Sequence, residues 1–226
     1  MSRGLGDVYK RQQMGRLFDL EDSGYFYTRL QNPTNDAVAA KICDLEGGVG
    51  AMLTSSGQAA NFYAMFNICE AGGHIVASSA IYGGTYNLLG TTMKKLGIDC
   101  TFVSPEADEA ELQAAIRPNT KLIFGETISN PTLEVLDIEL FARVAHKNGI
   151  PLVVDNTFAT PINCRPFEFG ADIVVHSTTK YMDGHGAALG GAIIDGGKFD
   201  WMAHADKFPG LCTPDESYLS LIHISE

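Results

Sequence analysis

Hydrophobic and polar positions alternate along the chain with two different periods. Short apolar runs rich in β-branched residues predict strands at residues 50–56, 74–79, 100–104, 121–127, 151–157 and 171–177. Between them, apolar residues recur at helical spacing over residues 35–48, 57–73, 85–97, 108–116 and 137–149. Nearly continuous apolar strands separated by helices predict an α/β fold, in which a mostly parallel sheet is sandwiched by helices in one large domain.

The two ends of the chain do not fit this pattern. Residues 5–12, LGDVYKRQ, can be encoded by DNA whose reverse complement encodes LSLIHISE, the sequence of residues 219–226. Complementary coding at opposite ends has no protein-level reason, and the DNA resembles the transposase adaptor of sequencing libraries. We therefore expect residues 1–12 and 219–226 to be non-native and to carry no fold information. The natural part, residues 13–218, is expected to be a fragment cut at both ends.

Composition narrows the classes of function. The chain has 226 residues, of which 45% are hydrophobic, and a formal net charge of −11. This suits a soluble domain with a substantial core, and it argues against a nucleic-acid or membrane-surface role because no basic stripe is present. The five dispersed cysteines indicate reduced thiols and a cytoplasmic protein, and the six histidines show no metal-ligand spacing, so no metal is expected.

Polar residues gather where three predicted strands end. They are Ser55-Ser56-Gly57, Asp155-Asn156-Thr157 and Ser177-Thr178-Thr179-Lys180. In an open parallel sheet, ligands bind beyond the carboxyl ends of the strands, so these clusters are expected to meet at one site.

The stretch TSSGQAAN, residues 54–61, reads as a strand end, a glycine turn and a helix start. Free N–H groups and the positive helix end favour a phosphate there. The alternative is a serine that caps the helix beside a packing glycine. Neither a Walker loop nor a dinucleotide fingerprint is present.

Asp155 and Lys180 complete the expected chemistry. A carboxylate directly after a buried strand is costly unless it meets a cation or strong donors, although it can instead cap a turn. A lysine at a strand end is, taken alone, more often a solvated surface residue. Together, a phosphate seat, a carboxylate for a protonated ring nitrogen and a lysine for a Schiff base are what pyridoxal 5′-phosphate requires.

Six motifs carry a resemblance to a known family. They are YTRLQNPT, SSGQAA, YGGTYNL, ETISNPT, VVDNTFATP and HSTTKYMDGHG. With them the chain resembles the central part of the Cys/Met-metabolism family of pyridoxal-phosphate enzymes, over essentially all of residues 13–218. The resemblance implies the large domain of a fold type I transferase, with the C-terminal small domain missing.

The resemblance also implies roles for individual residues. Lys180 would be the Schiff-base lysine and proton shuttle in a partly desolvated site, and Asp155 would pair with the pyridine nitrogen. Tyr82 would stack on the ring and assist proton transfer, unless it is an ordinary core aromatic. The other cofactor contacts implied are Ser56, Gly57, Gln58, Asn130, Thr157, Ser177 and Thr179, with Tyr27 and Arg29 reaching the phosphate of a neighbouring subunit.

Family branches differ in detail. Methionine γ-lyases carry a cysteine where this chain has Gly84, and the motifs look most like the O-acetylhomoserine sulfhydrylase branch. That implies γ-replacement of acetate by sulfide to give homocysteine. The alternatives are methionine γ-lyase, cystathionine synthase or lyase, or a fragment without turnover. The implied layout is an N-terminal segment at 13–35 and a cofactor-binding large domain at 36–218, in a homo-oligomer, a dimer of dimers, that takes amino-acid substrate and sulfide.

Overall fold

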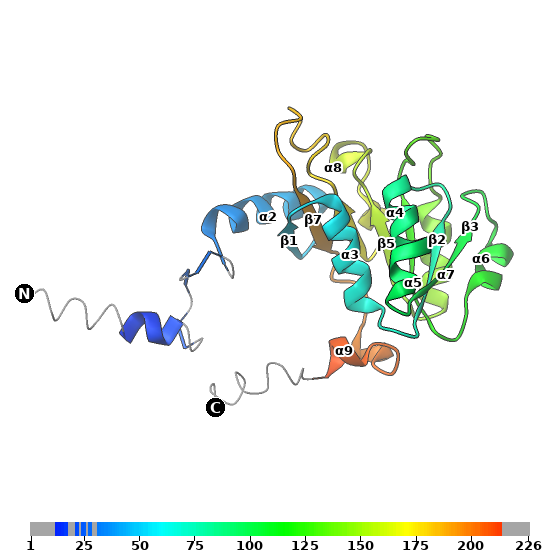
Figure 1. Cartoon of the computed structure of the whole chain (residues 1–226), viewed down its shortest axis with the longest axis horizontal. Coiled ribbons are helices and arrows are strands. Elements are labelled where there is room, and N and C mark those ends of the chain that lie inside the picture. The colour runs from blue at the N-terminus through cyan, green and yellow to red at the C-terminus, as the bar shows by residue number, and fades with distance from the viewer. Residues whose placement is uncertain (1–11, 18–20, 23, 26, 29–30, 214–226) are drawn as a thin grey trace, which may run out of the picture. The chain divides into compact units, whose positions relative to one another are not determined.

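The computed structural model of the chain describes residues 12–17, 21–22, 24–25, 27–28 and 31–213. The chain divides into two compact units, one comprising residues 39–212 and the other residues 1–38 with 213–226. The sheet lies entirely in the unit 39–212 (Figure 1).

Seven strands form one sheet in the order β1-β7-β6-β5-β4-β2-β3. Their bounds are Gly50–Thr54 (β1), His74–Ser78 (β2), Asp99–Val103 (β3), Thr120–Glu126 (β4), Leu152–Asp155 (β5), Ile173–His176 (β6) and Gly191–Asp195 (β7). Strands β2 to β6 pair in parallel, whereas β7 is antiparallel to both β1 and β6. Strand β1 therefore runs in the same direction as β6, and the carboxyl ends of all strands except β7 share one edge.

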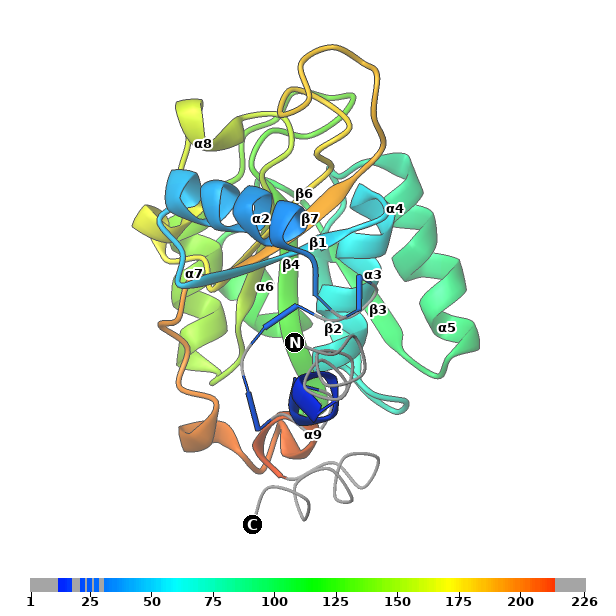
Figure 2. The ribbon, with the colours of Figure 1, turned by 90° about the vertical axis from the view of Figure 1, so that its left-hand side faces the viewer.

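Helices cover both faces of this sheet. From residue 31 onward the α-helices are α2 (Pro33–Glu46), α3 (Gly57–Ile68), α4 (Gly83–Asn87), α5 (Met93–Lys95), α6 (Glu109–Ala115), α7 (Ile138–Lys147), α8 (Thr160–Asn163) and α9 (Pro209–Cys212), with a π-helical turn at Leu88–Thr92 joining α4 to α5. Figure 2 shows α3, α4 and α5 on one side of the central strands and α6 and α7 on the other. The expected fold class, a mostly parallel sheet sandwiched by helices, is confirmed.

Local signals explain where the helices begin and end. Asp108 and Glu111 form a reciprocal capping box at the start of α6, which satisfies two N–H groups that the helix leaves free. Gly149 follows α7 with a φ of 61°, a left-handed conformation that costs glycine little.

The core lies on both faces of the central strands. Every residue of β5 and β6 is buried, and Phe124, Phe141 and Met65 are among the largest fully enclosed side chains. At the opposite edge from the strand carboxyl ends, His74 is also fully buried, and its two ring nitrogens lie 2.8 Å from the hydroxyls of Thr120 and Thr101. Burial lowers the pKa of His74 to about 4, so this histidine is neutral.

Strand β7 was not predicted. Its sequence, GAIID, is short and flanked by glycines, and its partner β1 is far away in the chain. All six predicted strands and five predicted helical segments are present, the third of them as α4, the π-helical turn and α5. No helix in the described ranges is long and apolar enough to cross a membrane, and all five cysteines are free thiols.

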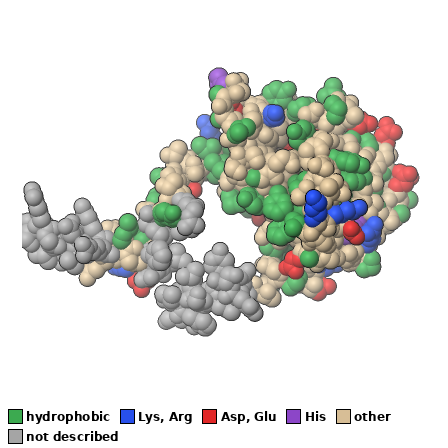
Figure 3. Space-filling view, viewed as in Figure 1, with side chains coloured by type: hydrophobic (Ala, Val, Ile, Leu, Met, Phe, Trp, Pro, Cys, Tyr) green, Lys and Arg blue, Asp and Glu red, His purple; other side chains and the backbone are tan. Residues whose placement is uncertain are grey.

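One face of this unit keeps apolar side chains exposed. Met52, Tyr63 and Phe66 are 55%, 50% and 43% exposed, and they line a hollow of about 520 Å³ together with Trp201 and Leu211. Figure 3 shows apolar side chains gathered over the region of α3. This patch is separate from the polar edge of the sheet.

Candidate active site

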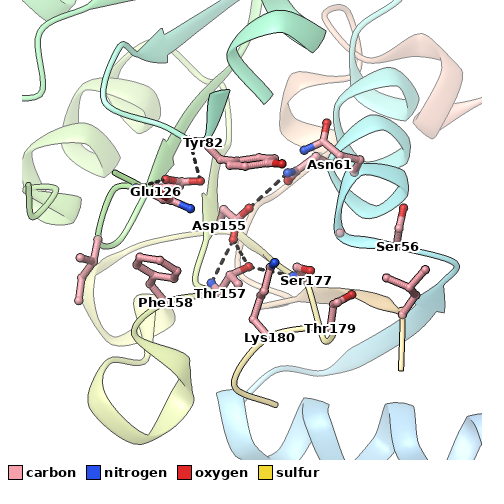
Figure 4. A pocket seen from close by; sticks show the side chains of 15 residues that line it. Ser56, Asn61, Tyr82, Glu126, Asp155, Thr157, Phe158, Ser177, Thr179 and Lys180 are labelled. Atoms are coloured by element: carbon pink, nitrogen blue, oxygen red, sulfur yellow. Dashed lines mark hydrogen bonds between the residues drawn. The ribbon is translucent and has the colours of Figure 1, made fainter. Parts of the chain in front are cut away.

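A pocket of about 230 Å³ opens at the carboxyl edge of the sheet. Its lining comprises Ser56, Gly57, Gln58, Asn61, Tyr82, Glu126, Ile128, Asn130, Asp155, Thr157, Phe158, Ser177, Thr179, Lys180 and Leu189. Every catalytic or cofactor-contact residue predicted from the sequence in the unit 39–212 is in this set, whereas Ser55, Asn156 and Thr178 of the polar clusters are not. The three polar clusters therefore do meet, because β1, β5 and β6 end at the same edge (Figure 4).

Asp155 is the last residue of β5 and is 7% exposed. Its Oδ1 accepts hydrogen bonds from Thr157 N at 3.0 Å and Thr157 Oγ1 at 2.5 Å, which is the turn cap considered above. Its Oδ2 accepts from Asn61 Nδ2 at 3.2 Å. The carboxylate thus caps the turn and also lines the pocket, so the two interpretations are compatible.

The start of α3 forms the second wall. Ser56 accepts a hydrogen bond from Ala59 N at 3.1 Å, so it caps the helix as well as lining the pocket. Gly57 packs against Ser177 so closely that a Cβ at residue 57 would lie 2.5 Å from Ser177 Cβ. The first-turn N–H groups of a helix and the hydroxyls of Ser56 and Ser177 form a set of donors suited to a phosphate, and Thr179 lines the same wall.

Lys180 follows the hydroxyl residues and extends into the pocket (Figure 4). Lys180 begins a loop that runs to Leu189, and hydrogen bonds between Thr179 and Gly190 join the two ends of this loop. Thr179 Oγ1 donates to Gly190 O at 3.2 Å and accepts from Gly190 N at 3.1 Å. Lys180 is exposed in the chain as described. The pocket around it is open to solvent.

Glu126 is a pocket residue that sequence reasoning missed. It ends β4, stands in register with Asp155 on β5, and is 6% exposed. Its two oxygens accept hydrogen bonds from the backbone N–H groups of Tyr82 at 3.0 Å and Asn130 at 3.2 Å. Glu126 therefore fixes both loops that carry expected cofactor contacts. The signal available in the sequence was its place at the end of a buried strand, the same signal that identified Asp155.

Two carboxylates next to each other at a buried edge repel. Burial, and then the charge of Asp155, raise the pKa of Glu126 to about 8, while the N–H groups of Tyr82 and Asn130 act in the opposite direction. Near neutral pH, Glu126 is therefore largely protonated.

Asn61, Ile128, Phe158 and Leu189 also line the pocket without having been predicted. Asn61 lies one turn of α3 beyond Gln58, a spacing that places both on one helix face. Asn61 Nδ2 donates to Asp155, but its Oδ1 is buried without a hydrogen-bond partner in the described structure. Such an atom is expected to meet a ligand or water.

Tyr82 is 47% exposed and its ring lies over Gly84, where a Cβ would come within 2.5 Å of Tyr82 Cε1. Of the two remaining predicted residues, Tyr27 is exposed and belongs to the other unit, and Arg29 lies outside the described residues. Their roles stay predictions. No group of three or more potential metal ligands occurs in the described ranges.

These residues fit pyridoxal 5′-phosphate. The pocket offers hydroxyls and a helix start for a phosphate, a buried carboxylate for a protonated ring nitrogen, an aromatic ring and a primary amine. The buried Asn61 Oδ1 without a partner adds a polar atom that a bound group can satisfy.

Comparison with known proteins agrees with this chemistry. Residues 6–221 match the family model for Cys/Met metabolism PLP-dependent enzymes. The chain is 52% identical over 207 residues to an O-acetyl-L-homoserine sulfhydrylase of Corynebacterium glutamicum, and 46% identical over 208 residues to a homocysteine/cysteine synthase of Kluyveromyces lactis. These alignments cover 90% and 92% of this chain, and 47% of each relative. The chain thus spans about half the length of these relatives.

A solved structure shows the same fold. The crystal structure described as an O-acetylhomoserine (thiol)-lyase of Campylobacter jejuni matches with a TM-score of 0.86 and 39% identity, over 92% of this chain and 51% of that one. That protein carries an N′-pyridoxyl-lysine-5′-monophosphate residue.

The raised pKa of Glu126 predicts a pH-dependent stability. Because the folded-state pKa of about 8 exceeds the unfolded value near 4.5, Glu126 contributes most stability below pH 4.5 and loses it as the pH rises through 8. The replacement Glu126→Gln removes this pH dependence, because glutamine does not ionise. The free energy of unfolding of the variant, relative to the parent, is expected to rise between pH 5 and pH 9, by at most about 5 kcal/mol.

Urea unfolding of both proteins at pH 5, 7 and 9 measures this difference. The hydrogen bond that glutamine cannot accept costs the same at every pH, so only the slope tests the prediction. Parallel pH profiles for the two proteins would show that Glu126 is already ionised in the folded chain.

Proposed function

Because the chain belongs to the Cys/Met metabolism PLP-dependent enzyme family, we propose that it supplies the cofactor site of an O-acetyl-L-homoserine sulfhydrylase. The cofactor of this family is pyridoxal 5′-phosphate. The reaction proposed is that of O-acetyl-L-homoserine with sulfide, giving L-homocysteine and acetate. This proposal rests on one observation. Asp155, Lys180 and the hydroxyl residues Ser56, Ser177 and Thr179 line the same pocket.

Each group has a task in this reaction. When bound, pyridoxal phosphate supplies an electron sink that acidifies the substrate carbons. The carboxylate of Asp155, which Thr157 and Asn61 hold by hydrogen bonds, would stabilise the protonated ring nitrogen of the cofactor. The amine of Lys180 takes a proton from the substrate α-carbon and can return it later in the cycle. Tyr82 forms one wall, and the phosphate seat fixes the orientation of the whole group.

The relatives and Gly84 support the sulfhydrylase branch of the family. Relatives that are 46% to 52% identical to this chain include sulfhydrylases and a homocysteine/cysteine synthase. In this chain the Tyr82 ring occupies the space that any side chain at residue 84 would need. The glycine therefore sets where the Tyr82 ring lies, which agrees with the sulfhydrylase pattern rather than with the cysteine typical of methionine γ-lyases.

The assembly and location proposed are a homo-oligomer, a dimer of dimers, in the cytoplasm. The expectation that Tyr27 and Arg29 reach a neighbouring subunit supports the oligomer. Five free thiols support a reducing compartment.

Replacement Lys180→Ala is expected to abolish covalent capture of the cofactor. The parent chain, mixed with pyridoxal phosphate and reduced with borohydride, should gain the mass of the pyridoxyl phosphate group, since the amine of Lys180 is the attachment point. Intact-mass spectrometry and the visible absorption spectrum measure the outcome. The exposed lysine variant Lys95→Ala is the control and should behave like the parent. Equal labelling of Lys180→Ala and the parent would assign the attachment elsewhere.

Turnover is tested in a chimera, in which this chain replaces the homologous half of the Corynebacterium glutamicum relative. Homocysteine formed from O-acetyl-L-homoserine and sulfide supports the proposal. Release of 2-oxobutyrate or pyruvate from methionine or cystathionine without sulfide would instead identify a lyase. A folded, cofactor-loaded chimera without any product would show that the chain supplies only binding.

Replacement Gly57→Ala is expected to weaken cofactor binding by at least about tenfold. The new Cβ would lie 2.5 Å from Ser177 Cβ and 2.8 Å from Ser177 Cα, so the two walls of the phosphate seat must move apart. Spectroscopic titration of the parent and the variant with pyridoxal phosphate measures the change. Gly50→Ala, where a Cβ meets nothing within 4 Å, is the matched control. If Gly57→Ala bound pyridoxal phosphate as tightly as the parent does, the phosphate would not bind between Gly57 and Ser177.

A further inference from the structure

Glu46, the last residue of α2, is a carboxylate enclosed in the interior at 1% exposure. Its Oε1 lies 2.5 Å from His176 Nε2 and accepts a hydrogen bond from Asn156 Nδ2 at 2.9 Å. His176 and Asn156 are 1% and 0% exposed. None of the three lines the pocket, and the proposed reaction uses none of them. Burying three polar side chains together is costly, so their place in the fold needs a reason.

Two members of this group adjoin the cofactor site along the chain. Asn156 directly follows Asp155, and His176 directly precedes Ser177. Successive side chains of an extended chain point to opposite sides. Asp155 and Ser177 therefore face the pocket while their neighbours contact Glu46, so the same short stretches of backbone carry both sets.

The network holds these stretches from behind. Asn156 accepts a hydrogen bond from Thr127 Oγ1 at 2.8 Å and donates a second one to Cys164 O at 2.9 Å. The end of β4, the end of β5, the α8 segment and α2 are thereby joined through one side chain. On the pocket side, Thr157 Oγ1 donates to Asp155 and accepts from Ser177 N at 2.8 Å. The ends of β5 and β6 are thus fixed on both faces.

Two atoms of the network have no hydrogen-bond partner among the described residues, namely Glu46 Oε2 and His176 Nδ1. Apolar residues of similar volume in place of a buried ionisable pair are often neutral or stabilising. The Glu46–His176 pair, which leaves two buried atoms without hydrogen bonds, is therefore not expected to add much to the stability of the fold. Its position behind Asp155 and Ser177 points to a different role.

We propose that Glu46 and His176 are positioning residues, whose buried contact sets the placement of Asp155 and Ser177 and thereby the affinity and orientation of the bound cofactor. The proposal rests on the cofactor site proposed above. It assigns a function to His176, which the family motif HSTTK contains but which the pocket does not use.

The test compares the parent chain with Glu46→Gln and His176→Gln. Titration with pyridoxal phosphate gives the dissociation constant, and visible-range circular dichroism reports the orientation of the bound cofactor. Each variant is expected to bind about tenfold more weakly and to change the dichroic band. The double variant should bind no more weakly than the weaker single variant, because both substitutions remove the same contact.

His74→Gln is the matched control. His74 is equally buried and bonded to two hydroxyls, but it lies at the opposite edge of the sheet. It should lower the melting temperature without changing the dissociation constant by more than about twofold. Thr127→Val is a milder variant that keeps the buried pair and removes one hydrogen bond to Asn156, so it should fold and weaken binding by about threefold.

A second readout does not need the cofactor. Amide hydrogen exchange of Thr157 and Ser177, whose N–H groups bond to Asp155 Oδ1 and Thr157 Oγ1, reports the local order of the site. Exchange at these two amides should accelerate in Glu46→Gln, His176→Gln and Thr127→Val, but not in His74→Gln.

If the parent itself binds no cofactor, the proposed cofactor site is wrong, and the exchange rates alone test whether Glu46 and His176 position Asp155 and Ser177. If the variants lose only stability, with affinity, dichroism and exchange following those of His74→Gln, the pair is structural and the inference is wrong.

Discussion

Backbone hydrogen bonds pair β4 with β5 and β5 with β6 in parallel, so that Glu126 stands beside Asp155 and Asp155 beside Val175. A slip of one residue would turn every side chain to the opposite face. Asp155 would then point away from the pocket and Asn156 would take its place. The chemistry of the site therefore depends on the register in which β4, β5 and β6 pair.

Buried acids around this edge are accommodated in three different ways. Asp155 is held by a hydroxyl and two N–H donors, Glu126 by two backbone N–H groups, and Glu46 by a histidine and an amide. Only Asp155 and Glu126 face the pocket. These two are register partners, and burial together with the neighbouring Asp155 raises the pKa of Glu126 to about 8.

The sequence predicted the sheet, its flanking helices and the convergence of the pocket because each of these depends on local pattern or on parallel strand order. Strand β7 was missed because it is short and makes its pairs with β1 and β6 across the sheet, where no local period marks it. Glu126 was missed for a related reason. A glutamate after an apolar run has many surface explanations, and only the pairing of β4 with β5 brings it to the pocket. The contact of Glu46 with His176 joins residues 130 positions apart, beyond the reach of any periodicity.

The reciprocal bonds between Thr179 and Gly190 have a consequence for how this site can vary. They close the segment between them into a loop whose base is pinned to the sheet. Lys180 directly follows Thr179 at the base of the loop, whereas residues 184–188 lie farther from the tied ends. Changes in the length or composition of that stretch can therefore reshape the mouth of the pocket while leaving the amine where it is. The fold separates a fixed reactive group from an adjustable entrance, which is the arrangement from which enzymes with one cofactor and many substrates can diverge.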